Sequence, residues 1–421
     1  MRGRMVRRLL LITVLLAGLL SASNGAGAVQ TADFSLAAGD AAFWSGPGDA
    51  ATCGSNCWRY TLEVTESAYR LRVGIDRPRL QDVWTARLFA PSGGQVGAFG
   101  PGTELYSAEI TRANPAPGVY TVEVTAGSVT DRRFRMRAAL ETDNGGLPTG
   151  RVEVPPNLRP LPPWDFSFLL SVTNGSTGGP STGVAVPTGR VACHAEEVAL
   201  YKAVRCLRMS FGVANAGLGP LELELGAGTQ FMDRPLIQAV RNADGSTVTR
   251  DAGNAYFHHS HSHYHHDRAI GLQLLKVTNE TTGTLASAGE PLRKGFAHRD
   301  ELLRDWTSFA PTWSKRGFGL LPGWGDYYEW DRPGNYIDFG LNEDGLYVVR
   351  ISADPDGFIA ETTRANNVAY SLVRVTGETV HHLESGMGTD PWDPCRTPLP
   401  LGPEFTDSFQ MPAPRPENCP E

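Results

Sequence analysis

Short runs in which apolar and polar residues alternate recur along this 421-residue chain. Residues 58–64, 70–75 and 120–124 each alternate, and Gly, Pro, Asp or Asn interrupts the chain between them. A period of two is the pattern of a strand with one buried face, and frequent turn residues are typical of antiparallel sandwiches and jelly rolls. The sequence therefore predicts an all-β protein whose residues 29–142 form a jelly-roll-like β-sandwich module, with a binding or spacer role.

A second β-sandwich-like domain is predicted over residues 165–376. Its strand candidates are residues 207–213, 221–225, 269–277 and 346–351. Helix signals are few, and the best is residues 299–304. Residues 143–164 form a linker and a proline-rich lead-in that we expect to lie extended along this domain. Residues 377–421, rich in Pro and Asp, are predicted to be a C-terminal tail.

The N-terminus has the pattern of a secretory signal peptide over residues 1–28. A basic stretch with four arginines precedes the apolar residues 9–20, and Ala26-Gly27-Ala28 fits a small-x-small cleavage site. No later run is apolar enough to span a bilayer. We expect a secreted, extracellular protein without a membrane anchor once the signal is removed.

Net charge excludes nucleic acid as the main partner. Loss of the signal removes four arginines and no acid, which takes the formal charge from −7 to −11. An acidic surface is compatible with cationic substrates and disfavours a polyanion.

The six cysteines also indicate an exported protein. An even number in such a chain predicts disulfides, and joining nearest neighbours is the simplest of about fifteen pairings. It would give Cys53–Cys57, Cys193–Cys206 and Cys395–Cys419. A metal site is the rival interpretation for the first pair, although no other soft ligand lies nearby.

The most unusual stretch is residues 257–267, which hold six of the ten histidines. His261, His263 and His265 alternate, so on an extended strand they would share one face. Imidazoles suit copper, zinc, iron and nickel. The ends of a flat five-residue run lie about 13 Å apart, whereas a ligating His Cα lies only about 6–6.5 Å from its ion. One ion can therefore bind all three only if the chain bends or bulges there.

An aromatic segment follows, with the run GLLPGWGDYY over residues 319–328 and Tyr336-Ile337-Asp338 after it. Most of these rings must fill the core. Together with the histidines, however, this segment resembles the catalytic domain of the lysyl oxidase family. The resemblance covers roughly residues 155–375 and includes PNLRP at 156–160, CHAEE at 193–197 and the closing Glu361 and Asn366-Asn367. The closing pattern is less specific, because bacterial adhesion modules share it.

The resemblance implies a copper amine oxidase. Its copper would be bound by His261, His263 and His265. Its quinone cofactor, lysine tyrosylquinone, would be built from Lys294 and Tyr328. Tyr327 is the neighbouring alternative for the tyrosine, and Lys276 and Lys315 are the alternatives for the lysine. Such enzymes use O₂ to convert primary amines, including peptidyl lysine, to aldehydes, with release of ammonia and hydrogen peroxide.

Several physical arguments support this assignment of roles. Imidazole-bound copper can promote oxidation of a phenol by O₂, and burial lowers a lysine's pKa toward the unprotonated amine that can add to the ring. A general base must then remove a substrate proton, and Asp326 is the candidate. The chain lacks the cysteines of the animal domain near the histidines and the tyrosine, so packing or the Lys294–Tyr328 bond itself must hold the site.

Two other functions remain open. One is a non-catalytic secreted protein used for adhesion or metal binding, whose N-terminal module binds a cell-surface ligand. The other is a zinc or iron enzyme with three histidine ligands and a water-activating carboxylate, for which Glu361 or Asp267 are nominal candidates. The presence of both Lys294 and Tyr328 favours the oxidase.

Overall fold

The structure is a computed structural model, and only part of the chain is described. The described residues are 33–47, 50–76, 83–102, 107–127, 134–142, 148–168, 193–194, 197–199, 202–259, 262–299, 302–303, 317–399, 401 and 419. The predicted signal peptide, with its cleavage site, lies outside them, as do His261 and Lys315. No helix in these ranges is long and apolar enough to cross a membrane.

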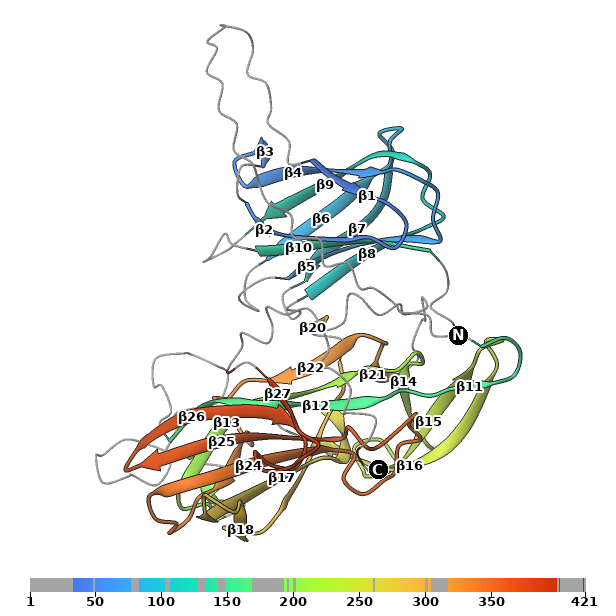
Figure 1. Cartoon of the computed structure of the whole chain (residues 1–421). Coiled ribbons are helices and arrows are strands. Elements are labelled where there is room, and N and C mark those ends of the chain that lie inside the picture. Colours follow the sequence, from blue (N-terminus) through green and yellow to red (C-terminus); the bar gives the residue numbers. More distant parts are fainter. Residues whose placement is uncertain are drawn as a thin grey trace, which may run out of the picture.

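The first part of the described chain folds into two small sheets with a core of their own. One sheet has the order β1-β4-β9-β6-β7, with β3 beside β4, and the other has the order β2-β10-β5-β8 (Figure 1). The strands are β1 (Asp33–Leu36), β2 (Ala41–Gly46), β3 (Ala51–Gly54), β4 (Cys57–Val64), β5 (Arg70–Asp76), β6 (Trp84–Phe89), β7 (Gln95–Gly102), β8 (Ser107–Ala113), β9 (Gly118–Ala126) and β10 (Phe134–Glu141). Burial along β4 alternates as the sequence pattern requires. Its inward-facing Tyr60 and Leu62 meet Val73 and Met136 of the other sheet, so this part is a β-sandwich.

The second part holds a larger sandwich. Its longer sheet runs β21-β14-β15-β16-β17-β24-β25-β26-β27, with β11 beside β15 and both β18 and β19 beside β17. The facing sheet runs β12-β13-β22-β20, with β23 beside β13. The strands are β11 (Glu153–Val154), β12 (Leu158–Ser167), β13 (Cys206–Asn215), β14 (Leu221–Leu225), β15 (Arg234–Asn242), β16 (Thr247–His258), β17 (His263–Asn279), β18 (Thr284–Ser287), β19 (Leu292–Phe296), β20 (Leu302–Leu303), β21 (Phe318–Leu320), β22 (Trp324–Tyr328), β23 (Tyr336–Asp338), β24 (Gly345–Ala353), β25 (Val368–Thr376), β26 (Thr379–Met387) and β27 (Thr397–Leu399).

The core of this sandwich lies between the two sheets. Leu207 and Phe211 of β13 contribute to it from one side, and Leu272 of β17 and Val349 of β24 from the other. All of β13 is buried. Alternation along β13 sends the even-numbered side chains, including Arg208, to the opposite face. The predicted all-β, sandwich-like fold is confirmed.

Three local expectations need correction or extension. The proline-rich lead-in, expected to lie extended along the second domain, is part of its sheets, because β12 pairs with β13 and β11 with β15. Residues 377–399 do not form a tail, because β26 and β27 extend the longer sheet. The helix expected over residues 299–304 is wrong for the described Leu302–Leu303, which pair with β22 as β20.

The three predicted disulfides are present: Cys53–Cys57, Cys193–Cys206 and Cys395–Cys419. Disulfides are typical of oxidising, extracellular-type compartments. Cys193, Glu197 and Cys206 also bring three potential metal ligands together. Both sulfurs are bonded to each other, however, and Glu197 pairs with Arg208 at 2.8 Å. This cluster is therefore a disulfide packed beside a buried ion pair.

Candidate functional site

The histidine segment forms the end of a β-hairpin. β16 ends at His258 and β17 begins at His263, and the antiparallel register places His258 opposite His263 and Tyr256 opposite His265. Ser262 has a positive φ of 55°, as tight connections often do. The chain therefore reverses direction between His258 and His263. His261 falls within this connection, outside the described residues.

Two of the predicted ligands converge. The Nε2 atoms of His263 and His265 lie 2.9 Å apart, and the His258 ring stacks on His265 with a centroid distance of 4.8 Å. Two nitrogens bound to one ion at about 2.0–2.1 Å, at a right angle, would also lie about 2.9 Å apart. The same distance suits a hydrogen bond between neutral imidazoles. The pair thus offers two nitrogen ligands on one face of the hairpin.

Contacts of Nδ1, the ring nitrogen that faces away from His263, fix the orientation of His265. Its Nδ1 lies 3.1 Å from the carbonyl oxygen of Gly295 and 3.1 Å from the hydroxyl of Tyr256. A carbonyl can only accept, so this contact requires the proton on Nδ1 and leaves the Nε2 lone pair toward His263. The imidazole is buried, with 7% of its surface exposed. His265 is therefore held in the tautomer that a metal ligand needs.

Lys294 lies on β19, the strand that supplies the Gly295 carbonyl. Its ammonium nitrogen is 4.5 Å from the centre of the buried Tyr336 ring. Burial lowers the pKa of Lys294 to about 8; the charge of Glu197 opposes this shift, and that of Arg208 adds to it. Burial thus shifts this lysine toward the unprotonated amine, although the ammonium remains the main form at neutral pH.

Tyr328 lies at the end of β22, a strand of the facing sheet. Its hydroxyl is 2.9 Å from both the carbonyl oxygen of Ala297 and Oδ2 of Asp326. Its ring packs on Phe296 at 4.7 Å and on Phe211 at 5.7 Å. Asp326 is buried and also accepts the Tyr327 backbone N–H at 3.0 Å. Asp326 and Tyr328 therefore form a buried carboxylate–phenol pair.

The predicted site residues that the structure describes are thus carried by β17, β19 and β22, but their side chains have different partners. The ammonium of Lys294 contacts Tyr336, whereas Tyr328 contacts Asp326. Of the alternatives, Tyr327 stacks on Trp164 at 5.2 Å, and Lys276 pairs with Glu343 at the surface at 3.3 Å.

Sequence reasoning missed two contributors to this region, Tyr256 and the Gly295 carbonyl. A tyrosine two residues before the first histidine was a weak signal for Tyr256. The Gly295 carbonyl had no sequence signal, because it reaches His265 only through the pairing of β17 with β19, whose register shifts between His266 and Ile270.

The carboxylates considered for a zinc or iron enzyme have other surroundings. Glu361 accepts the Leu158 N–H and the Asn367 side-chain amide, each at 2.7 Å. Burial raises its pKa to about 8, although these hydrogen bonds oppose the shift. Burial also raises the pKa of Asp267, against the charge of Arg268. Glu361 thus joins the start of β12 to the segment before β25.

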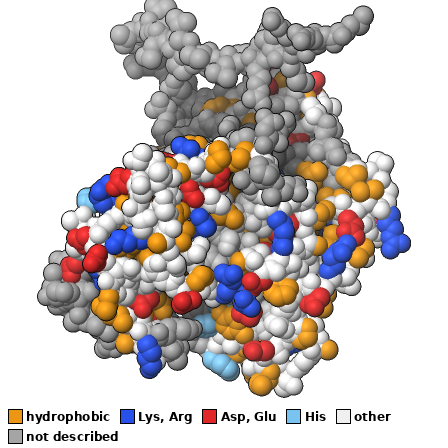
Figure 2. Space-filling model, turned by 60° about the horizontal axis from the view of Figure 1, so that its bottom comes forward, with side chains coloured by type: hydrophobic (Ala, Val, Ile, Leu, Met, Phe, Trp, Pro, Cys, Tyr) orange, Lys and Arg blue, Asp and Glu red, His pale blue; other side chains and the backbone are white. Residues whose placement is uncertain are grey.

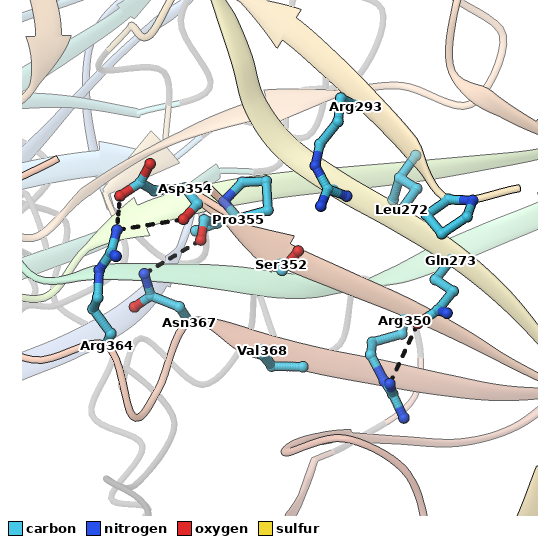
Figure 3. A pocket seen from close by; sticks show the side chains of 13 residues that line it. Leu272, Gln273, Arg293, Arg350, Ser352, Asp354, Pro355, Arg364, Asn367 and Val368 are labelled. Atoms are coloured by element: carbon cyan, nitrogen blue, oxygen red, sulfur yellow. Dashed lines mark hydrogen bonds and ion pairs between the residues drawn. The ribbon is translucent and has the colours of Figure 1, made fainter. Parts of the chain in front are cut away.

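A pocket of ≈ 440 Å³ lies on the outer side of the longer sheet (Figure 3). Arg293, Arg350 and Arg364 line it, and Figure 3 shows Arg364 turned to Asp354 and Arg350 to Gln273. Arg293 and Lys294 are neighbours on β19, so their side chains leave opposite faces. This pocket therefore lies on the other side of the strand from the ammonium of Lys294.

Charge is mixed over the face seen in Figure 2. Acidic and basic side chains alternate there with apolar ones, and histidine side chains reach the surface at its edge. A surface of this kind has no broad positive patch on the side in view, in keeping with the net charge.

Comparisons with known proteins found only distant likenesses. No family model matches the chain, and no curated protein matches it. Among solved structures, the pre-peptidase C-terminal domain of a collagenase from Bacillus anthracis matches with 13% identity and a TM-score of 0.18, over 27% of this chain and 97% of that chain. Two structures of a GH2 β-galacturonidase from Eisenbergiella tayi match with 11% and 13% identity and TM-scores of 0.16 and 0.18. They cover 48% and 64% of this chain and 36% and 38% of theirs. Likenesses this distant carry no functional argument.

Proposed function

We propose that this protein is a secreted copper-dependent amine oxidase of lysyl oxidase type, with Lys294 and Tyr328 as the precursors of its quinone. The observation that carries the proposal is the convergence of the His263 and His265 Nε2 atoms beside β19. Two imidazoles aimed at one point, backed by the carbonyl next to a lysine of lowered pKa, form an unusual arrangement for a purely structural hairpin.

The residues present fit a copper ion. His263 and His265 would hold it, and His261 is the predicted third ligand. The Nδ1 proton of His265 is directed to Gly295, so its Nε2 is available without rearrangement. When bound, copper and the quinone together supply the redox chemistry that takes a primary amine, O₂ and water to an aldehyde, ammonia and hydrogen peroxide.

The chain's own residues have separate tasks in this proposal. Lys294 supplies an amine that is unprotonated in part near neutral pH, because it is buried. Asp326 accepts the phenolic hydrogen of Tyr328 at Oδ2 and can take up that proton. Phe211 and Phe296 pack against the Tyr328 ring and restrict access of water to it.

The ammonium of Lys294 and the ring of Tyr328 must meet for the quinone to form. Lys294 and Phe296 alternate on β19 and share a face, and the Phe296 ring touches Tyr328. Rotation of the long lysine side chain away from Tyr336 would bring the amine toward Tyr328 past Phe296. The proposal therefore requires the lysine to leave the contact that it makes in this structure.

The direct experiment is mass spectrometry of copper-loaded full-length protein after proteolysis. A peptide containing Lys294 joined to one containing Tyr328 is expected, together with peroxide release from primary amines that stops on copper chelation. Lys276→Met is the matched control, because that lysine pairs with Glu343 at the surface. Recovery of both peptides only in free form after copper loading in air, with no peroxide, would overturn the proposal.

A second candidate function is a non-catalytic metal-binding or adhesion protein. The packing of the Lys294 ammonium on Tyr336 favours it, because this contact gives the lysine a structural role. In that case copper would bind the wild-type protein, and Lys294→Met would leave its affinity and the spectrum of the bound ion unchanged without any cross-link in the parent protein.

A further inference from the structure

We propose that Tyr256 is a positioning residue that, with the Gly295 carbonyl, aligns His265 for copper. It thereby connects the histidine hairpin of β16 and β17 to β19, the lysine strand, which carries Lys294. The inference rests on the proposed copper site and deepens it. It assigns to a tyrosine outside the histidine run the task of orienting one ligand.

The first support is the position of the Tyr256 hydroxyl. It lies 3.1 Å from His265 Nδ1 and 3.4 Å from the Gly295 carbonyl oxygen, while Nδ1 and that oxygen are 3.1 Å apart. Three polar atoms thus form a closed triangle. The carbonyl oxygen has two lone pairs and can accept from the imidazole and the phenol together. The hydroxyl therefore completes the environment of the nitrogen that faces away from the ion.

The second support is the backbone at Gly295. A Cβ at this position would lie 2.5 Å from Cε1 of Tyr256 and 2.7 Å from the carbonyl oxygen of His266. Any side chain there would displace either the tyrosine ring or the strand that follows His265. Glycine is therefore what allows β19 to approach the hairpin closely enough for its carbonyl to reach the imidazole.

The third support is the register of the hairpin. Tyr256 of β16 lies directly opposite His265 of β17, and their ring centroids are 5.2 Å apart. Cross-strand partners share a face, so the phenol has a fixed place beside the imidazole. The neighbouring tyrosine, Tyr264, points to the other face, where its hydroxyl accepts the N–H of Phe231 at 2.9 Å. The hairpin thus carries its own control for the loss of a tyrosine hydroxyl.

The consequence is a mechanical link between metal and amine. Gly295 follows Lys294 directly, so the carbonyl that accepts from His265 belongs to the peptide unit just after the lysine. A change in the angle of the imidazole would be passed to β19 through this hydrogen bond. Tyr256 limits that angle, and in doing so limits where the lysine strand can lie.

The test compares Tyr256→Phe with Tyr264→Phe in the full-length protein. Each variant removes one hydroxyl and keeps the ring. Copper(II) affinity is measured by competition with a chelator, and the ligand field of the bound ion by electron paramagnetic resonance. We expect Tyr256→Phe to lower affinity about 10-fold or more and to shift the copper hyperfine coupling, as loss of a hydrogen bond behind a ligand does. Tyr264→Phe is expected to change neither.

Gly295→Ala tests the same contact between His265 and β19 from the other strand. It should lower copper affinity at least as much as Tyr256→Phe does, because the added methyl group displaces the ring or the strand. Equal affinity and identical spectra for Tyr256→Phe and wild type would overturn the inference while leaving the copper site intact. A wild-type protein whose copper spectrum lacks imidazole nitrogen coupling would overturn the proposed function together with it.

Discussion

The ammonium nitrogen of Lys294 lies 4.5 Å from the centre of the Tyr336 ring, although Tyr328 is the tyrosine that the family resemblance selects. The contact is a cation–π arrangement around a largely desolvated charge, worth up to about 2 kcal/mol. Two phenols therefore compete for one amine: Tyr336 as its resting partner, and Tyr328 as its proposed covalent partner.

Tyrosine-to-phenylalanine variants separate these two roles. Tyr328→Phe removes the phenol that must be oxidised, so cross-linked peptide and peroxide release should fall below detection. Tyr336→Phe keeps a ring under the ammonium and should retain most of both. The measurement is peptide mass spectrometry with a peroxide assay on the copper-loaded proteins. Loss of the cross-link only in Tyr336→Phe would instead identify Tyr336 as the precursor.

Lys294→Met should alter how stability depends on pH. The folded-state pKa is lowered to about 8 from an ordinary value of 10.5, so the folded protein binds fewer protons than the unfolded chain between these values. The free energy of unfolding of the uncross-linked wild type should therefore rise as pH increases from 8 to 10.5. The destabilisation caused by burying the charged lysine is fully present below pH 8. In Lys294→Met this rise should disappear. Thermal unfolding of metal-free protein across that range measures it, and parallel curves for the two proteins would contradict the prediction.

Glu361→Gln should remove a pH dependence of stability that runs in the opposite direction and at lower pH. The folded-state pKa is raised to about 8 from 4.5, so the folded protein holds a proton that the unfolded chain releases. The stability that this proton contributes is complete below pH 4.5 and is lost as pH rises toward 8. The amide cannot ionise, so Glu361→Gln should unfold at a higher temperature than wild type at pH 8, with a smaller difference at pH 4.5. An unchanged difference across this range would mean that Glu361 is ionised in the folded protein throughout.

Removing one partner of the buried Glu197–Arg208 pair should be strongly destabilising. Both side chains are almost fully buried, and Arg208 Nη1 lies 2.8 Å from Glu197 Oε2. Glu197→Ala leaves a guanidinium without its counter-charge and should cost about 3–5 kcal/mol of unfolding free energy. Glu153→Ala is the control, because its pair with Arg250 is exposed and should contribute less than about 1 kcal/mol. Urea unfolding compares them, and equal losses would be inconsistent with a desolvated pair at Glu197.

Much of the fold could be predicted from the sequence because alternation is local. The strand over residues 58–64 was visible because it buries every second side chain. The strand over residues 346–351 was visible as a short apolar run, most of which is buried on both faces. β26 was missed because the outer part of its run is only partly buried, with His381 and His382 among its residues, so its pattern is weak. Leu302–Leu303 lie in a helix-like sequence, and pairing with β22 overrides that preference.

The candidate site was less predictable because it depends on contacts between strands. The spacing of His263 and His265 predicted a shared face, and the structure brings their nitrogens together. Which backbone carbonyl stands behind His265 depends on the register of β19 against β17, and a register shift occurs between His266 and Ile270. The side-chain partner of Lys294 depends on β23, which no local pattern connects to β19.

The Cys193–Cys206 disulfide encloses the short helical turn that carries Glu197, and Arg208 stands two residues beyond it. Closing this loop restricts the unfolded chain and so favours the folded arrangement in which the carboxylate meets Arg208. A chain with reduced thiols would lose this restriction and should unfold more easily around the buried ion pair. The buried charge pair therefore owes part of its stability to oxidised thiols, which are typical of extracellular-type compartments.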